Sequence, residues 1–295
     1  LILFLVFLLI LAGSPFLTRK TLALEAYGKG QTQENTSSSA KAAFATESDH
    51  FILEEDLSSY FKDVDGTFVL YDMNENSYRI YNEKQSRERF SPASTYNIYS
   101  GLFALEEHSI TPEKSQMGWD GAFWPFDTWN QNQDLTSAMQ NSVNWYFQNL
   151  DQELGIQKLT AYYQKIRYGN CDLSDGIHQY WKEASLQISP MEQVELLASL
   201  YQNTWGFDAE NIQAIKAAML ISSQNGCSLY GKTGTGRIQE KDQNGWFVGI
   251  VENQEKTWCF ALHLQGKDHA GGAKASSIAL EILTAKGIYG ETSSK

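Results

Sequence analysis

The stretch SPASTYNIYS, residues 91–100, places a serine at the start of an apolar helix. Pro92 favours an extended residue before it and suits the first turn of a helix. Apolar residues then recur at spacings of four and three from Ile98 onward, as on one helical face. Ser94 is therefore expected in the first turn, where the helix dipole favours negative charge, with Asn97 one turn further on. A helix N-cap is the commoner role of such a serine, so its assignment as a nucleophile depends on other motifs.

Strand-like segments lie on both sides of this helix in the sequence. β-branched and aromatic residues, with turn residues between the first two segments, predict strands at 66–72, 78–81, 228–234, 246–252 and 257–264. Helical spacing dominates the middle of the chain, residues 91–220, and returns at 273–286. This order predicts an α+β fold, in which an antiparallel sheet formed by both ends of the chain is flanked by helices and a helical lobe is inserted. A cleft is expected where the sheet meets the lobe.

A second motif, YGKTGTG at residues 230–236, lies in one of these strands. A Lys-Thr pair at a strand edge can hold a carboxylate, because the ammonium supplies charge and the hydroxyl supplies a donor. The glycines allow a ligand to approach the backbone closely. A turn between two strands is the structural alternative for this segment.

Taken together, the motifs resemble those of the serine β-lactamases and penicillin-binding proteins, and the class D β-lactamase branch in particular. Six elements occur in family order over about 200 residues: Ser94-Thr95-Tyr96, Ser142-Val143-Asn144, Tyr168-Gly169-Asn170, Trp181 to Pro190, Lys232-Thr233-Gly234 and Gly245 to Gly249. Within that branch the sequence is most similar to the sensor domains of the BlaR/MecR β-lactam receptors. Segments 94–100, 139–147 and 230–236 carry this likeness.

The resemblance implies a class D β-lactamase-like fold and a role for each motif residue. Ser94 is the implied nucleophile, Ser142 the proton relay, and Lys232 with Thr233 the carboxylate clamp. An oxyanion hole is implied between the Ser94 N–H and a backbone N–H near Thr235. Further substrate-binding residues would be Gly234, Thr235, Val143, Trp181 and Tyr168, the last two as wall or packing residues.

Asn97 departs from the family pattern, which has a lysine three residues after the serine. In class D proteins that lysine is carboxylated and acts as a base, whereas an amide cannot hold a proton at neutral pH. Loss of a positioned base typically costs about 10² to 10⁴ in rate. This argues against a hydrolytic β-lactamase and is less damaging to a receptor, which is acylated once. Lys232 and Ser142 are the candidates to compensate in part for the missing base.

We therefore predict a β-lactam sensor domain that is acylated on Ser94 and deacylates poorly. Three alternatives remain: a class D β-lactamase, an enzyme acting on peptidoglycan peptides, and a non-catalytic penicillin-binding-like module. β-Lactam antibiotics are the expected ligands and peptidoglycan peptides the second candidates.

The composition argues against several classes of function. With a formal net charge of −12, the chain lacks the positively charged surface that nucleic-acid binding requires. The five histidines are scattered without a metal-binding motif, so neither a metal nor a cofactor is expected. Three cysteines at wide spacing do not form a disulfide framework, although one pair could still bridge.

The N-terminal sequence predicts attachment to a membrane. Residues 1–17, LILFLVFLLILAGSPFL, carry no charge and predict the end of a transmembrane segment from a larger membrane region; a signal-peptide core is the alternative. Residues 18–48 are rich in Ser, Thr, Gln and Ala and predict a flexible tether, followed by the folded domain at 49–290. The resemblance then places this domain outside the cell. Arg19 and Lys20 argue mildly against that orientation by the positive-inside rule.

Overall fold

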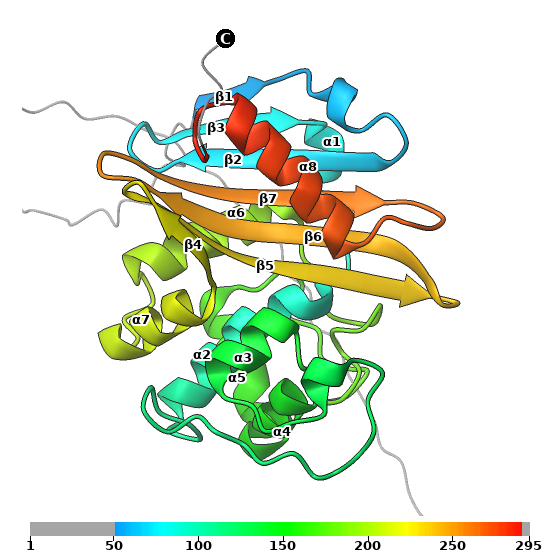
Figure 1. Cartoon of the computed structure of the whole chain (residues 1–295), viewed down its shortest axis with the longest axis vertical. Coiled ribbons are helices and arrows are strands. Elements are labelled where there is room, and N and C mark those ends of the chain that lie inside the picture. Colours follow the sequence, from blue (N-terminus) through cyan, green and yellow to red (C-terminus); the bar gives the residue numbers. More distant parts are fainter. Residues whose placement is uncertain (1–50, 291–295) are drawn as a thin grey trace, which may run out of the picture. The chain divides into compact units, whose positions relative to one another are not determined.

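A seven-stranded sheet lies at the centre of the computed structural model, which describes residues 51–290. The strand order is β1-β3-β2-β7-β6-β5-β4, so strands from both ends of the chain lie side by side (Figure 1). The α+β class and the joining of both chain ends are as the sequence predicts. The bounds are β1 Phe51–Glu54, β2 Asp65–Asp72, β3 Ser77–Tyr81, β4 Leu220–Gln224, β5 Cys227–Ile238, β6 Lys241–Glu252 and β7 Thr257–Gln265.

The sheet is mixed, so the prediction of a purely antiparallel sheet is wrong at one edge. β1 pairs with β3 in parallel, while the other neighbours are antiparallel. β1 has only four residues, all exposed, so its sequence shows no alternation of buried and exposed positions. β4 was also not predicted: helix α7 ends at Ala218, and the turn Asn225-Gly226, with φ values of 52° and 74°, joins β4 to β5 as a hairpin.

Helices cover both faces of the sheet. Helix α8 (Gly272–Ala285) crosses one face, and α6 (Pro190–Gln202) lies against the other (Figure 1). Helices α2, α3, α4, α5 and α7 form the predicted helical lobe beside β5 and β4 (Figure 1). Their bounds are α2 Asn97–Glu106, α3 Leu135–Asn141, α4 Asn144–Leu154, α5 Ile156–Ile166 and α7 Ala209–Ala218, with the short α1 at Glu83–Ser86 near β2 and β3.

Alternating side chains of the strands divide the interior into two cores. Trp246, Val248 and Ile250 of β6 point into the core shared with α6 and the lobe. Their neighbours Phe247 and Val251 point into the core under α8. Because both faces are covered, the middle parts of β6 and β7, residues 246–251 and 258–262, carry no charged or polar side chains other than that of Cys259.

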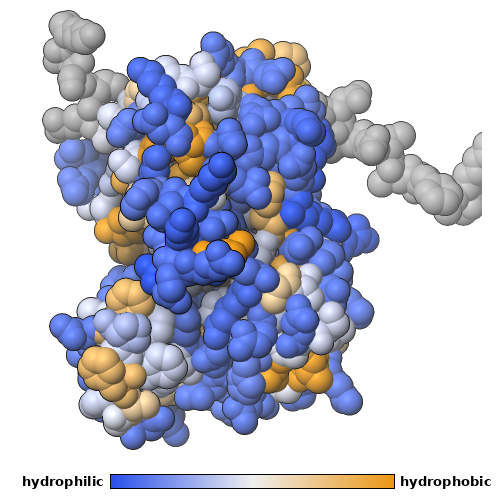
Figure 2. All heavy atoms as spheres, turned by 90° about the vertical axis from the view of Figure 1, so that its right-hand side faces the viewer, coloured by the Kyte–Doolittle hydropathy of each residue, from blue (hydrophilic) through white to orange (hydrophobic). Residues whose placement is uncertain are grey.

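The surface at one end of the sheet is mostly hydrophilic. Figure 2 faces the end where β5 and β6 join, and its apolar patches are small and separate. Within residues 51–290, none of the helices is sufficiently long and apolar to cross a membrane. The transmembrane segment predicted at 1–17 and the tether predicted at 18–48 lie outside the described residues.

Candidate active site

Ser94 lies in a 3-10 turn, Ala93–Tyr96, that leads directly into helix α2. The turn is tight: Ala93 has a φ of 46°, which is uncommon for a residue with a side chain. The Asn97 N–H donates to the Ser94 carbonyl, and the Thr95 hydroxyl donates to the carbonyl of Pro92. Gln193 of α6 in turn donates to the Thr95 hydroxyl at 2.8 Å. The backbone of the nucleophile candidate is thus held from two sides.

Strand β5 packs directly against this turn. A Cβ placed on Gly234 would lie 3.0 Å from the Pro92 carbonyl oxygen and 3.3 Å from the Ser94 nitrogen. Glycine therefore allows the strand to approach the serine, which brings together two motifs about 140 residues apart in sequence.

Lys232 and Ser142 form a hydrogen-bonded pair. Ser142 ends helix α3 in the left-handed conformation, with a φ of 52°. The Lys232 Nζ donates to the Ser142 Oγ and, at 2.8 Å, to the Thr233 carbonyl. Lys232 is 3% exposed, and this burial lowers the pKa of its ammonium to about 7. A lysine with a pKa near 7 can both lose and take up a proton close to physiological pH.

A cavity of about 410 Å³ opens beside Ser94. It brings together residues of the 3-10 turn, the segment before α3, the α3–α4 junction and the β5–β6 hairpin. The lining residues are Ser94, Phe126, Thr128, Trp129, Asn141, Ser142, Asn144, Thr233, Thr235, Arg237 and Asp242. Thr235 Oγ1 accepts a hydrogen bond from the Gly272 N–H, so the Thr235 hydroxyl hydrogen is left for another acceptor.

Other residues predicted for the site lie in the core instead of on the cavity wall. Val143 and Tyr168 have no exposed surface, and Trp181 is 3% exposed. The Trp181 ring stacks on Tyr96 with centroids 4.5 Å apart. Lys232 lies behind the cavity wall and reaches the site through Ser142.

Asn97 is fully buried one turn beyond Ser94. Neither its Oδ1 nor its Nδ2 has a hydrogen-bond partner among the described residues. A buried amide without partners costs stability, because both groups lose their contacts with water. An amide here can donate or accept hydrogen bonds, but it cannot take up a proton.

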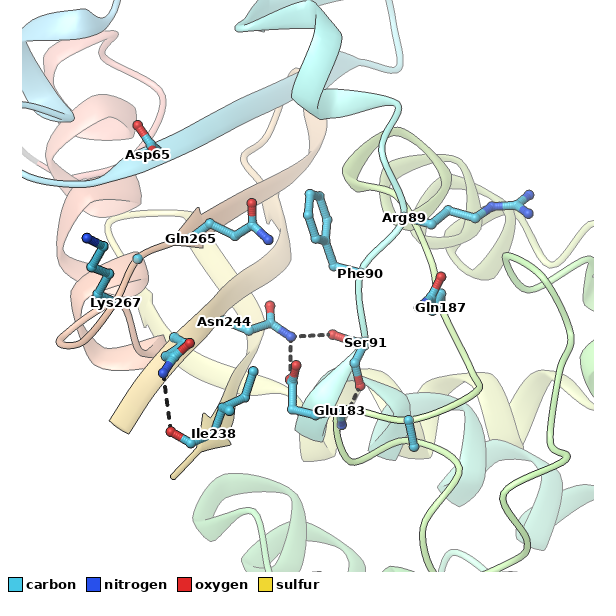
Figure 3. A pocket seen from close by; sticks show the side chains of 13 residues that line it. Asp65, Arg89, Phe90, Ser91, Glu183, Gln187, Ile238, Asn244, Gln265 and Lys267 are labelled. Atoms are coloured by element: carbon cyan, nitrogen blue, oxygen red, sulfur yellow. Dashed lines mark hydrogen bonds between the residues drawn. The ribbon is translucent and has the colours of Figure 1, made fainter. Parts of the chain in front are cut away.

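A polar framework anchors the chain that leads into the turn. Asn244 Nδ2 donates to the Ser91 carbonyl at 2.9 Å and to the Glu183 carboxylate at 2.6 Å; Figure 3 shows both hydrogen bonds as dashed lines from the Asn244 nitrogen. The Ser91 hydroxyl donates to the Trp181 carbonyl, so the framework also fixes the Trp181 loop. A second cavity, of about 470 Å³, lies here and does not include Ser94.

A buried carboxylate ties the same loop to helix α2. Asp151 of α4 accepts hydrogen bonds from Ser100 of α2 at 2.6 Å and from Tyr180 at 2.8 Å. Burial raises the pKa of Asp151 to about 7, since no cation is hydrogen-bonded to it or forms an ion pair with it in the described part of the chain.

Several residues that line the cavity were not predicted from the sequence. Phe126 and Trp129 belong to an aromatic-rich segment, GWDGAFWPFDTW at 118–129, whose position shortly before Ser142 was a usable signal. Arg237 follows the glycine-rich motif directly, and its ion pair with Asp242 depends on the hairpin that brings them together.

The chain is similar to known proteins in both sequence and structure. The family of the penicillin binding protein transpeptidase domain matches residues 66–284. The regulatory protein BlaR1 of Bacillus licheniformis is 47% identical over 237 residues, covering 80% of this chain and 39% of that protein. The methicillin resistance mecR1 protein of Staphylococcus aureus is 44% identical over 227 residues, with 77% and 39% covered. The chain thus spans about two fifths of the length of these relatives.

Two further proteins are matched over most or all of their own length. The solved C-terminal domain of the Bacillus licheniformis BlaR penicillin-receptor is 45% identical, with a TM-score of 0.80, and the match covers 83% of this chain and 100% of that one. The β-lactamase OXA-20 of Pseudomonas aeruginosa is 38% identical, with 70% of this chain and 77% of that protein covered.

Proposed function

Since the chain belongs to the penicillin-binding transpeptidase family, as a sensor domain of the BlaR/MecR type with a class D β-lactamase-like fold, we propose that it binds β-lactams covalently through Ser94. The hydrogen bond from Lys232 to Ser142, which lines the Ser94 cavity, is the observation that carries this proposal. It supplies a proton path that does not use residue 97.

The proposed step begins with attack of the Ser94 Oγ on the lactam carbonyl carbon. An O–C bond forms and the lactam C–N bond breaks. The Ser94 hydroxyl proton passes to the neutral Lys232 amine through the Ser142 hydroxyl. The protonated Lys232 then returns a proton along the same route to the leaving lactam nitrogen. An acyl-enzyme and an opened ring result, with no net gain or loss of protons.

The second half of a hydrolytic cycle lacks its base. Asn97 is buried where the family has its lysine, and its amide cannot deprotonate a water molecule. The acyl-enzyme is therefore long-lived, which suits a receptor better than a β-lactamase. We further propose that residues 1–17 anchor the chain in the cell membrane and residues 18–48 tether the domain outside it.

Intact-protein mass spectrometry of the chain after incubation with benzylpenicillin tests the proposal. A lasting adduct on the parent, absent from Ser94→Ala, is the expected result. No adduct on the parent, with one on Asn97→Lys, would mean that Asn97 silences an intact pocket and that the chain is a non-catalytic binding module. Rapid nitrocefin turnover by the parent would instead identify a β-lactamase. Release of D-Ala from a peptide ending in D-Ala-D-Ala would identify a peptidoglycan enzyme.

A further inference from the structure

A further cavity, of about 300 Å³, lies where β2 and β3 meet the end of α8. Three of the described residues that line it are cationic, namely Arg79, Lys256 and Lys286, whereas Asp72 is the one acidic residue among them. Lys256 forms ion pairs with Asp72 and Glu75, so its charge is balanced. Arg79 and Lys286 therefore give the cavity its positive charge, in a chain whose formal net charge is −12.

Arg79 and Lys286 share a single carboxylate, that of Glu55. Glu55 accepts a hydrogen bond from the Arg79 Nη1 at 3.1 Å and another from the Lys286 Nζ. Two cations and one carboxylate leave one positive charge. The other guanidinium nitrogens of Arg79 make no hydrogen bond within residues 51–290, and the side chain is 53% exposed. These nitrogens are therefore free to donate to the oxygens of an anion such as a phosphate.

Exposed apolar side chains adjoin the cavity on the same face of the sheet. Arg79 lies opposite Leu70 of β2 on one side and opposite Leu53 of β1 on the other, so these three side chains form one row. Phe51 precedes Leu53 by two residues and shares its face. Phe51 is 68% exposed and Leu53 is 43% exposed. A cationic cavity beside an exposed apolar strip suits a ligand that joins an anionic group to a hydrocarbon.

The position of this face in the chain favours a membrane lipid as that ligand. β1 is the first strand of the described chain, and it follows the segments predicted as a membrane anchor and a tether. In Figure 1, β1 and β3 form the edge of the sheet beside the C-terminal end of α8. The cavity shares no lining residue with the Ser94 cavity. Contact between this face and a bilayer therefore uses none of the residues proposed for acylation.

We propose that the face formed by Phe51, Leu53, Arg79 and Lys286 docks on a bilayer that contains anionic phospholipids. The two cations bind a lipid phosphate, and the two apolar side chains enter the head-group region. This inference rests on the proposed membrane anchor and not on the chemistry at Ser94. The tether makes weak docking effective, because it holds the domain at a high local concentration beside the bilayer.

The isolated domain, residues 49–295, separates docking from insertion of the predicted anchor. The described residues belong to one compact unit, and the C-terminal domain of the Bacillus licheniformis BlaR penicillin-receptor was solved as a chain that the match covers completely. Co-sedimentation of this domain is measured with vesicles of phosphatidylcholine alone and with vesicles that also contain phosphatidylglycerol. We expect binding to the second kind only, and weaker binding at higher salt, although the net charge of the chain is negative.

Two pairs of matched variants locate the contact. Arg79→Gln is compared with Arg87→Gln, because both arginines are ion-paired and 53% exposed. Leu53→Ser is compared with Ile238→Ser, because these strand residues are 43% and 44% exposed. We expect vesicle binding to fall about 5-fold in Arg79→Gln and about 3- to 10-fold in Leu53→Ser. The two controls should bind like the parent, and thermal unfolding verifies that each variant is folded.

Three results would overturn the proposal: equal binding to both kinds of vesicle, binding to neither, or equal losses in a variant and its control. Calorimetric titration with inorganic phosphate is run in parallel. Phosphate binding without vesicle binding would mean a site for a free anion, which also overturns docking on a membrane. Acylation of the same variants by benzylpenicillin should match that of the parent, so a failure of covalent function at Ser94 is a separate result.

Discussion

Replacing Asn97 with leucine tests whether the buried Asn97 amide, one turn beyond Ser94, lowers the stability of the domain. Leucine has the same branching and the same number of side-chain heavy atoms but no polar atoms, so it removes two groups that have no partner among the described residues. Such a group typically costs about 1–3 kcal/mol when buried.

Fitting the bulkier methyl groups of leucine into a packed site costs about 1–3 kcal/mol and offsets part of this gain, so Asn97→Leu is expected to raise the free energy of unfolding by about 1–3 kcal/mol. For a domain of this size, 1 kcal/mol shifts Tm by about 2–4 °C, so the expected rise is about 2–12 °C. Thermal and denaturant unfolding, followed by circular dichroism, measure it.

Asn244→Leu is the matched control, because Asn244 is also buried, at 4% exposed, but fully partnered. Its amide bonds to Ser91, Glu183 and His263, so the same substitution should lower the free energy of unfolding by about 2–4 kcal/mol. The reasoning is refuted if Asn97→Leu leaves stability unchanged or lowers it. That result would mean that the Asn97 amide is hydrogen-bonded in solution.

Three further outcomes are expected. The raised pKa of Asp151 means that the folded state binds a proton more tightly than the unfolded chain, so stability falls as pH rises from about 4 to about 7, by on the order of 3–4 kcal/mol. Asp151→Asn should remove this slope in urea unfolding followed across that range, and an unchanged slope would contradict it. The rate of acylation should rise as Lys232 loses its proton near pH 7 and level off above pH 8, whereas a profile flat from pH 6 to 8 would exclude Lys232 as the proton acceptor. Gly169→Ala should cost about 3 kcal/mol or more in unfolding experiments, because φ is 48° and its Cβ would lie 1.9 Å from the Gln187 carbonyl oxygen; Gly176→Ala, at a φ of 83° in open space, should cost only about 1 kcal/mol.

Local sequence patterns were sufficient for the class of fold and for most of its elements. Short runs of β-branched and aromatic residues predicted the strands at 66–72, 246–252 and 257–264, which overlap β2, β6 and β7, because a strand buried on both faces has a nearly continuous apolar sequence. The motifs around Ser94, Ser142 and Lys232 predicted the family, which the comparisons confirm. Each of these signals lies within a few consecutive residues.

Only the tertiary structure decided what depends on residues distant in the chain. β1 pairs in parallel with β3, but the four residues of β1 are all exposed and their sequence has no pattern that predicts this pairing. Burial of Lys232 against Ser142 lowers its pKa, which the motif itself does not reveal. Likewise, the face of β5 and the hairpin partner Asp242 turn Arg237 toward the cavity. Burial, charge pairing and access to solvent are properties of the packed molecule, so they emerge only when these segments meet.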